Sequence, residues 1–104
     1  SIIPHNYFSL FLAHGYYLLN QNEKGDEILL EFAKENLKEY NFYLSLDDTH
    51  LKASSHDMEQ TIAIYYEIRK VANAFGRKEV MTYMEEMLTS FQDGIAKSEF
   101  ANRP

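Results

Sequence analysis

The sequence predicts an all-α domain in which four helices form two stacked antiparallel hairpins. Apolar residues recur at three- and four-residue spacing along most of the 104-residue chain, which is the period of amphipathic helices. Short polar turns at residues 20–22 and 76–77 divide this pattern into pairs, and turns of that length join antiparallel neighbours. Strand-like alternation with a period of two is not evident. We expect one domain over residues 1–104.

The first predicted hairpin begins near Pro4, which suits a first helical turn. From there to Asn20 the apolar residues cover most of the helix circumference, so we expect a largely buried helix. Asn22 is a favourable N-cap residue for the second helix. The apolar stripe of that helix consists of Leu29, Ala33, Leu37, Tyr40 and Leu44.

The second predicted hairpin follows a long connection of mixed polarity at residues 45–55. Ser54 and Asp57 fit a capping box that opens the third helix, and Gly76 is suited to the position just beyond its end. The fourth helix starts near Lys78, and residues 97–104 are expected to fray. The apolar stripes of these two helices contain Ile64, Ile68, Val71 and Phe75, and then Val80, Met84, Met87, Leu88, Phe91 and Ile95.

The first hairpin also matches the pattern of a tetratricopeptide repeat. Small and apolar residues stand at the spacings where the two helices of such a repeat touch, namely Leu12, Ala13, Tyr16, Gly25, Leu29 and Phe32. We expect Gly25 to face Ala13 or Tyr16 at a close helix contact, where Ala would be tolerated and a larger side chain would not. Because such repeats usually need about three units for stability, we expect the chain to be a terminal part of a longer protein.

Composition excludes several classes of partner. The chain has 10 basic and 16 acidic residues and a net charge of -6, so the phosphates of a nucleic acid would be repelled. Its apolar runs are far shorter than the roughly 20 residues of a membrane-spanning helix, and we expect no direct membrane insertion. Hydrophobic residues still make up 45% of the chain, which is enough for a core.

The sequence offers no set of residues that predicts catalysis, a metal or a cofactor. Cysteine is absent, and the four histidines do not follow metal-ligand spacing. We interpret His14 as a half-buried structural residue rather than a haem or other ligand. Asp47 and Asp48 could form a carboxylate pair, but neighbouring loop side chains point apart, so a solvated turn is the preferred interpretation. We therefore predict that the chain is not an enzyme.

A surface for a protein or peptide partner is predicted from tyrosines and basic residues. Amphipathic tyrosine rings are common at contact surfaces, and four basic residues gather around the second turn, where an acidic group could dock. The alternatives are that the tyrosines belong to the core and that the basic residues complement the negative end of the third helix. The predicted surface consists of Tyr16, Tyr17, Tyr65, Tyr66, Arg69, Lys70, Arg77 and Lys78.

Several segments together resemble one group of proteins. They are Ile3-Pro4-His5-Asn6-Tyr7-Phe8, Ala13-His14-Gly15-Tyr16-Tyr17, Glu39-Tyr40-Asn41-Phe42-Tyr43-Leu44-Ser45-Leu46, Glu59-Gln60-Thr61-Ile62-Ala63 and Val71-Ala72-Asn73-Ala74-Phe75-Gly76. In order and spacing the chain resembles the C-terminal region of large bacterial multi-pass membrane proteins related to protein O-mannosyltransferases.

This resemblance implies that two regions of a longer protein have separate roles. A membrane region outside this chain would carry any glycosyl transfer, and this domain would be a non-catalytic interaction module on the extracytoplasmic, periplasmic side. It would hold an acceptor protein or pack against the parent protein's own loops. The alternative is a free-standing regulatory helical domain that binds a peptide or a small apolar ligand.

Overall fold

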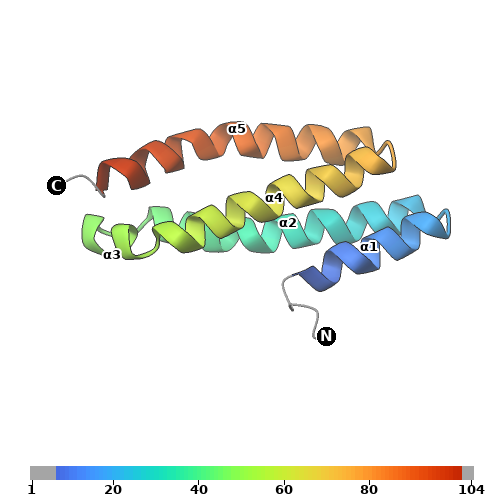
Figure 1. The fold of residues 1–104 in the computed structure, drawn as a ribbon, viewed down its shortest axis with the longest axis horizontal. Coiled ribbons are helices and arrows are strands. Elements are labelled where there is room, and N and C mark those ends of the chain that lie inside the picture. The colour runs from blue at the N-terminus through green and yellow to red at the C-terminus, as the bar shows by residue number, and fades with distance from the viewer. Residues whose placement is uncertain (1–6, 102–104) are drawn as a thin grey trace.

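The computed structural model describes residues 7–101, and beyond residue 91 it describes only the course of the helix backbone. In this part of the chain there are five helices and no strands, which confirms the all-α prediction. The helices are α1 (Phe8–Leu18), α2 (Asn22–Leu44), α3 (Asp48–Ala53), α4 (Ser55–Ala74) and α5 (Lys78–Ala101). Figure 1 shows α1 beside α2, α5 beside α4, and α4 resting on α2.

The turns that follow α1 and α4 have the same backbone design. Asn20 and Gly76 both adopt a positive φ, of 60° and 65° respectively. The next amide donates to a carbonyl in the last helical turn, Gln21 to Tyr16 at 2.9 Å and Arg77 to Ala72 at 2.9 Å. These are Schellman motifs, which close a helix end with a left-handed residue. The expectation that Gly76 lies just beyond a helix end is therefore confirmed.

The connection between the two helix pairs contains a short helix that the sequence did not predict. α3 begins where Asp47 accepts a hydrogen bond from the backbone N–H of His50 at 3.0 Å. The predicted capping box at Ser54 is wrong, because its hydroxyl donates to the carbonyl of His50 at 2.9 Å and does not cap α4. Asn22 likewise lies inside α2, after Gln21 at the N-cap position. The domain thus has a fifth helix with a single buried side chain, Leu51.

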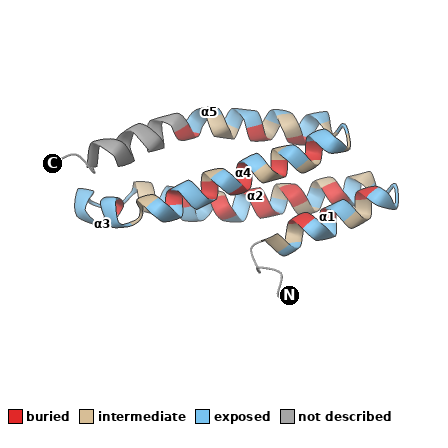
Figure 2. Cartoon of the chain, in the orientation of Figure 1, coloured by how far each residue is buried: buried red, intermediate tan, exposed pale blue. Residues whose placement is uncertain are grey.

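The core lies where α2, α4 and α5 face one another, as the buried positions in Figure 2 show. Its centre is aromatic, with the ring of Phe91 at 4.3 Å from that of Tyr40 and 4.8 Å from that of Tyr65. Both tyrosine hydroxyls donate to backbone carbonyls, Tyr40 to Phe91 at 3.1 Å and Tyr65 to Ala33 at 2.6 Å. These bonds satisfy polar groups that would be costly to bury alone.

The apolar stripes predicted for the second to fourth helices largely match this core, and the side chain of Ile95 lies outside the described residues. Leu29, Ala33 and Tyr40 of α2 are buried, as are Ile64 and Ile68 of α4. Residues 97–101 continue α5 and do not form the predicted tail, while residues 102–104 lie outside the described part.

Candidate interaction surface

A three-residue polar network fixes α1 against the rest of the domain. The hydroxyl of Tyr17 donates to Asp26 Oδ1 at 2.7 Å. Arg77 grips both oxygens of the same carboxylate, through Nε at 3.0 Å and Nη2 at 2.7 Å. Tyr17 lies in the last turn of α1, Asp26 in the first turns of α2, and Arg77 just before α5. This one carboxylate therefore joins three segments. An arginine that donates two hydrogen bonds to one carboxylate fixes the relative orientation of the two side chains.

The network also changes the acidity of its members. Burial alone would raise the pKa of the Asp26 carboxyl, but the hydrogen bonds from Arg77 and Tyr17 and the charge of Arg77 lower it below its ordinary value. Burial, followed by the hydrogen bond and charge of Asp26, raises the pKa of the Tyr17 hydroxyl. At neutral pH the carboxylate is therefore charged and the phenol is neutral.

Gly25 allows the Tyr17 ring to lie against α2. A Cβ atom built at Gly25 would come within 2.7 Å of Cδ1 and Cζ of Tyr17. The sequence correctly indicated a close helix contact at Gly25, but it named Ala13 or Tyr16 as the neighbour, and the neighbour is Tyr17.

With its inner face held in this way, α1 presents an apolar face outward. Only three residues of α1 are buried, namely Leu10, Ala13 and Tyr17, so the prediction of a largely buried helix is wrong. Five large apolar side chains on the opposite face are 41 to 68% exposed. With the glycine among them they form a line at helical spacing, which we call the outer stripe: Phe8, Phe11, Leu12, Gly15, Leu18 and Leu19.

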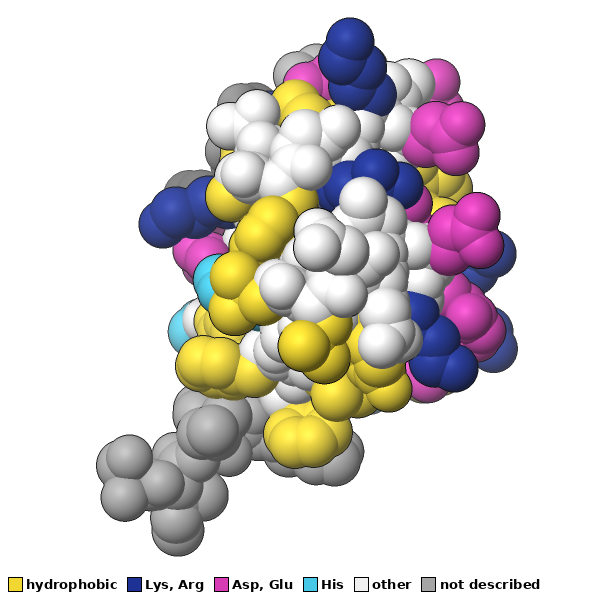
Figure 3. Space-filling view, turned by 90° about the vertical axis from the view of Figure 1, so that its right-hand side faces the viewer, with side chains coloured by type: hydrophobic (Ala, Val, Ile, Leu, Met, Phe, Trp, Pro, Cys, Tyr) yellow, Lys and Arg dark blue, Asp and Glu magenta, His cyan; other side chains and the backbone are white. Residues whose placement is uncertain are grey.

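The outer stripe stands out in a strongly acidic chain. The first charged side chain of the sequence is Glu23, so α1 carries no Asp, Glu, Lys or Arg at all. Figure 3 shows hydrophobic side chains gathered at the end of the molecule where the turns lie, on the side of α1. Contiguous exposed apolar surface of this kind marks contact sites on soluble proteins.

Beside the outer stripe, an apolar pocket of about 420 Å³ lies between α1 and α4. His14 is part of its lining, with its ring edge-on to Phe75 at 5.1 Å. His14 is exposed and not half-buried as predicted. The pocket is lined by Tyr7, Leu10, Phe11, His14, Glu67 and Val71.

A second pocket, of about 390 Å³ and of polar character, lies between α2 and α4 next to the start of α1. Glu35, Glu39 and Asp57 contribute carboxylates to its lining, and Asn36 and Thr61 contribute neutral polar groups. Asn36 donates to the carbonyl of Phe32 at 2.9 Å and Thr61 to that of Asp57 at 3.3 Å. These bonds are directed at the helix backbone, which is a structural use of both side chains.

The predicted tyrosine and basic surface is only partly assembled. Tyr17 and Tyr65 are buried and cannot contact a partner. Arg77 is held by Asp26. The sequence does not show that the hydroxyls of Tyr17 and Tyr65 have hydrogen-bond acceptors within the domain.

The remaining members of that surface are divided among three helices. Tyr66 and Arg69 lie together on α4, with the guanidinium carbon 5.2 Å from the ring centroid. Lys70 lies beside them in a shallow depression. Tyr16 is half-buried on α1 and Lys78 is exposed at the start of α5. The function of this group of residues stays a prediction.

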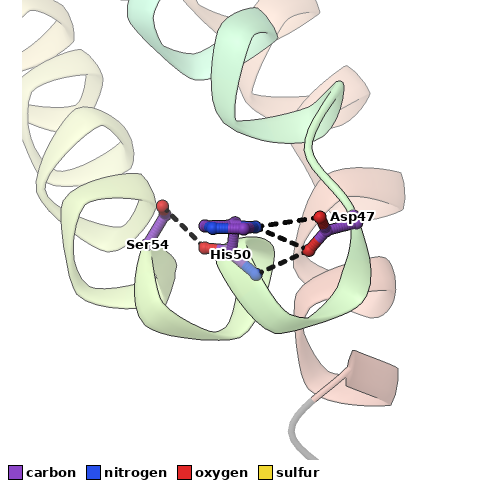
Figure 4. Close-up of polar contacts among 3 residues, drawn as sticks. All are labelled: Asp47, His50 and Ser54. Carbon is purple, nitrogen blue, oxygen red and sulfur yellow. Dashed lines mark hydrogen bonds and ion pairs between the residues drawn. The ribbon is translucent and has the colours of Figure 1, made fainter.

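The other candidate pair, Asp47 and Asp48, belongs to the start of α3. Figure 4 shows Asp47 facing His50, whose Nδ1 lies 2.8 Å from Oδ1 and 2.9 Å from Oδ2. The backbone and side-chain hydrogen bonds of His50 lower the pKa of the Asp47 carboxyl. Asp47 therefore acts as a helix cap, and a solvated turn was only an approximate description.

Within the described residues, no three His, Cys, Asp or Glu side chains are close enough together to hold a metal ion. The helices described there also lack a segment of sufficient length and apolarity to cross a membrane. Comparison of the chain with protein-family models, with curated proteins and with solved structures gives no match.

Proposed function

We propose that this chain is a non-catalytic interaction module that holds an amphipathic helix on the outer stripe of α1. The observation that carries this proposal is the uncharged, exposed apolar face of α1 in a chain of net charge -6. A helix with apolar residues at three- and four-residue spacing would cover such a face by packing its side chains between those of α1. The rigid inner network holds α1 in place for this contact.

In the context that the sequence resemblance suggests, the module is the extracytoplasmic C-terminal domain of a membrane protein related to protein O-mannosyltransferases. Glycosyl transfer would then belong to a membrane region outside this chain. The module would contribute by holding the acceptor protein or by packing against a segment of its own parent. In both cases the outer stripe is the contact surface, and the tetratricopeptide-like pairing of helices is the scaffold.

The proposal can be tested with a synthetic amphipathic helical peptide that has leucines along one face and uncharged polar residues elsewhere. Fluorescence anisotropy should detect binding to the wild-type chain. Leu18→Glu should weaken this binding by about tenfold or more, because it places a charge in the contact. Phe42→Glu is the matched control, since Phe42 is similarly exposed but lies on α2. Equal binding by all three chains would exclude the outer stripe as the contact surface.

A second function, a regulatory domain that binds a small apolar ligand, is favoured by the pocket between α1 and α4. Its volume of about 420 Å³ lies within the range of small-molecule sites. Val71→Phe should fill part of this space and reduce uptake of a fluorescent apolar probe such as anilinonaphthalene sulfonate. Unchanged uptake would place the probe elsewhere and remove the support for this alternative.

A further inference from the structure

We infer that the helix that covers the outer stripe is α1 of a second copy of this chain, in an antiparallel two-fold arrangement that crosses at Gly15. The inference rests on the proposed function, because it names the partner of the same surface. Its basis is the order of apolar residues around Gly15, the open space at this glycine, and the size and charge of the face.

Four of the five large residues of the outer stripe are arranged symmetrically about Gly15. Leu12 and Leu18 lie three positions before and after it, and Phe11 and Leu19 lie four positions before and after it. A two-fold contact requires a surface that is complementary to itself. If two α1 helices cross antiparallel at Gly15, the helical period of 3.6 residues places Phe11 of each copy against Leu18 of the other. Leu12 and Leu19 meet in the same way.

Gly15 gives the crossing point its close approach. A Cβ atom built at Gly15 meets no atom of the described chain within 4 Å. Packing within the described part of one copy therefore does not require a glycine here, in contrast to Gly25. A glycine at a helix crossing lets two backbones come nearer than larger residues allow. The two large side chains before the glycine and the two after it can then interlock with those of the other copy.

The charge and the area of the face suit a second copy. Two chains of net charge -6 repel each other at most surfaces, but α1 brings no charged side chain into the contact. With about 200 Å² for a fully exposed large side chain, the exposed fractions of the five large residues leave roughly 550 Å² per copy. A symmetric pair would bury about 1,000 Å², which is below the range of stable specific interfaces and within that of weak, transient ones. We therefore expect a dimer of micromolar stability.

The test uses two variants that each remove the symmetric contact and together restore it. Phe11→Lys and Leu18→Glu alter exposed positions, so each chain should fold, which circular dichroism would check. Sedimentation equilibrium from about 1 to 500 μM should show a dimer for the wild type and monomers for each variant alone. An equimolar mixture should regain the dimer, because the introduced lysine of one chain then faces the introduced glutamate of the other while the second Phe11–Leu18 pair remains. Phe42→Glu should dimerise like the wild type.

The outcomes separate this inference from the proposed function. A monomeric wild type at the highest concentration would overturn the second-copy arrangement, yet Leu18-dependent binding of the synthetic peptide would leave the proposed function intact. A wild-type dimer that persists in both single variants would place the dimer contact elsewhere. Failure of the mixture to dimerise would exclude antiparallel pairing, since a parallel pair brings Phe11 against Phe11. A wild-type chain that neither forms a dimer nor binds the synthetic peptide would overturn both proposals.

Discussion

The ring of Tyr17 occupies the space that a side chain at Gly25 would fill. It cannot easily withdraw, because its hydroxyl is bound to Asp26 at 2.7 Å and its ring packs on Phe75 at a centroid distance of 5.0 Å. A substitution at Gly25 therefore acts on three segments, since the ring connects α1 to α2 and to the end of α4.

Gly25→Ala should destabilise the domain, contrary to the tolerance that the repeat pattern predicted. The added methyl group would overlap the Tyr17 ring, and overpacking typically costs about 1 to 3 kcal/mol, against a gain of up to about 1 kcal/mol from helix propensity. We expect a net loss of about 1 to 2 kcal/mol in chemical denaturation. An unchanged or higher free energy of unfolding would mean that the ring moves aside freely.

Gly15→Ala should have the opposite effect on the folded monomer. Among the described residues, no atom lies within 4 Å of the new methyl group, and replacing glycine inside a helix usually gains up to about 1 kcal/mol. Denaturation at a concentration well below that of dimer formation should therefore show a more stable chain. A loss of stability would indicate that position 15 is crowded by residues outside the described part.

Acid should weaken the domain through Asp26. Because its folded pKa lies below the ordinary 3.8, the folded state binds fewer protons than the unfolded state. This contribution is fully present above about pH 4 and is lost as the pH falls through the folded pKa. Asp26→Asn should be less stable than the wild type at pH 6, with a difference that shrinks toward pH 2. A constant difference would show that the carboxylate charge is unimportant.

Alkali should weaken the domain through Tyr17 and Tyr65. Burial is the main cause that raises both hydroxyl pKa values above the ordinary 10.0. Stability from these groups is fully present below pH 10 and is lost as the pH rises through their folded pKa values. In an absorbance titration of the 8 tyrosines, these two should ionise only with unfolding. Tyr65→Phe should lower the absorbance change that accompanies unfolding.

Helical periodicity was sufficient to predict α2, α4 and the described part of α5, because each has one apolar face that is buried. It failed for α3, whose six residues include only Leu51 as a buried anchor. It also failed for the outer stripe. In a helix such as α1, apolar residues occur on all sides, so the sequence does not show which face packs against the rest of the chain.

The polar network was missed for a different reason. Asp26 and Arg77 are 51 positions apart, and neither belongs to a recognisable motif. The Asn20 and Gly76 turns bring them together, because both turns lie at the same end of the molecule. Only the tertiary arrangement distinguishes Arg77 from a basic residue available to a partner.

The single carboxylate of Asp26 makes the two ends of the molecule unequal. At one end it ties the last turn of α1, the start of α2 and the α4–α5 turn into one unit, while α3 at the other end relies on Leu51 and exposed hydrogen bonds (Figure 1). Hydrogen exchange should follow this asymmetry. Amides near both turns should lose protection together, and those of α3 should exchange much earlier, through openings that leave the rest of the domain folded.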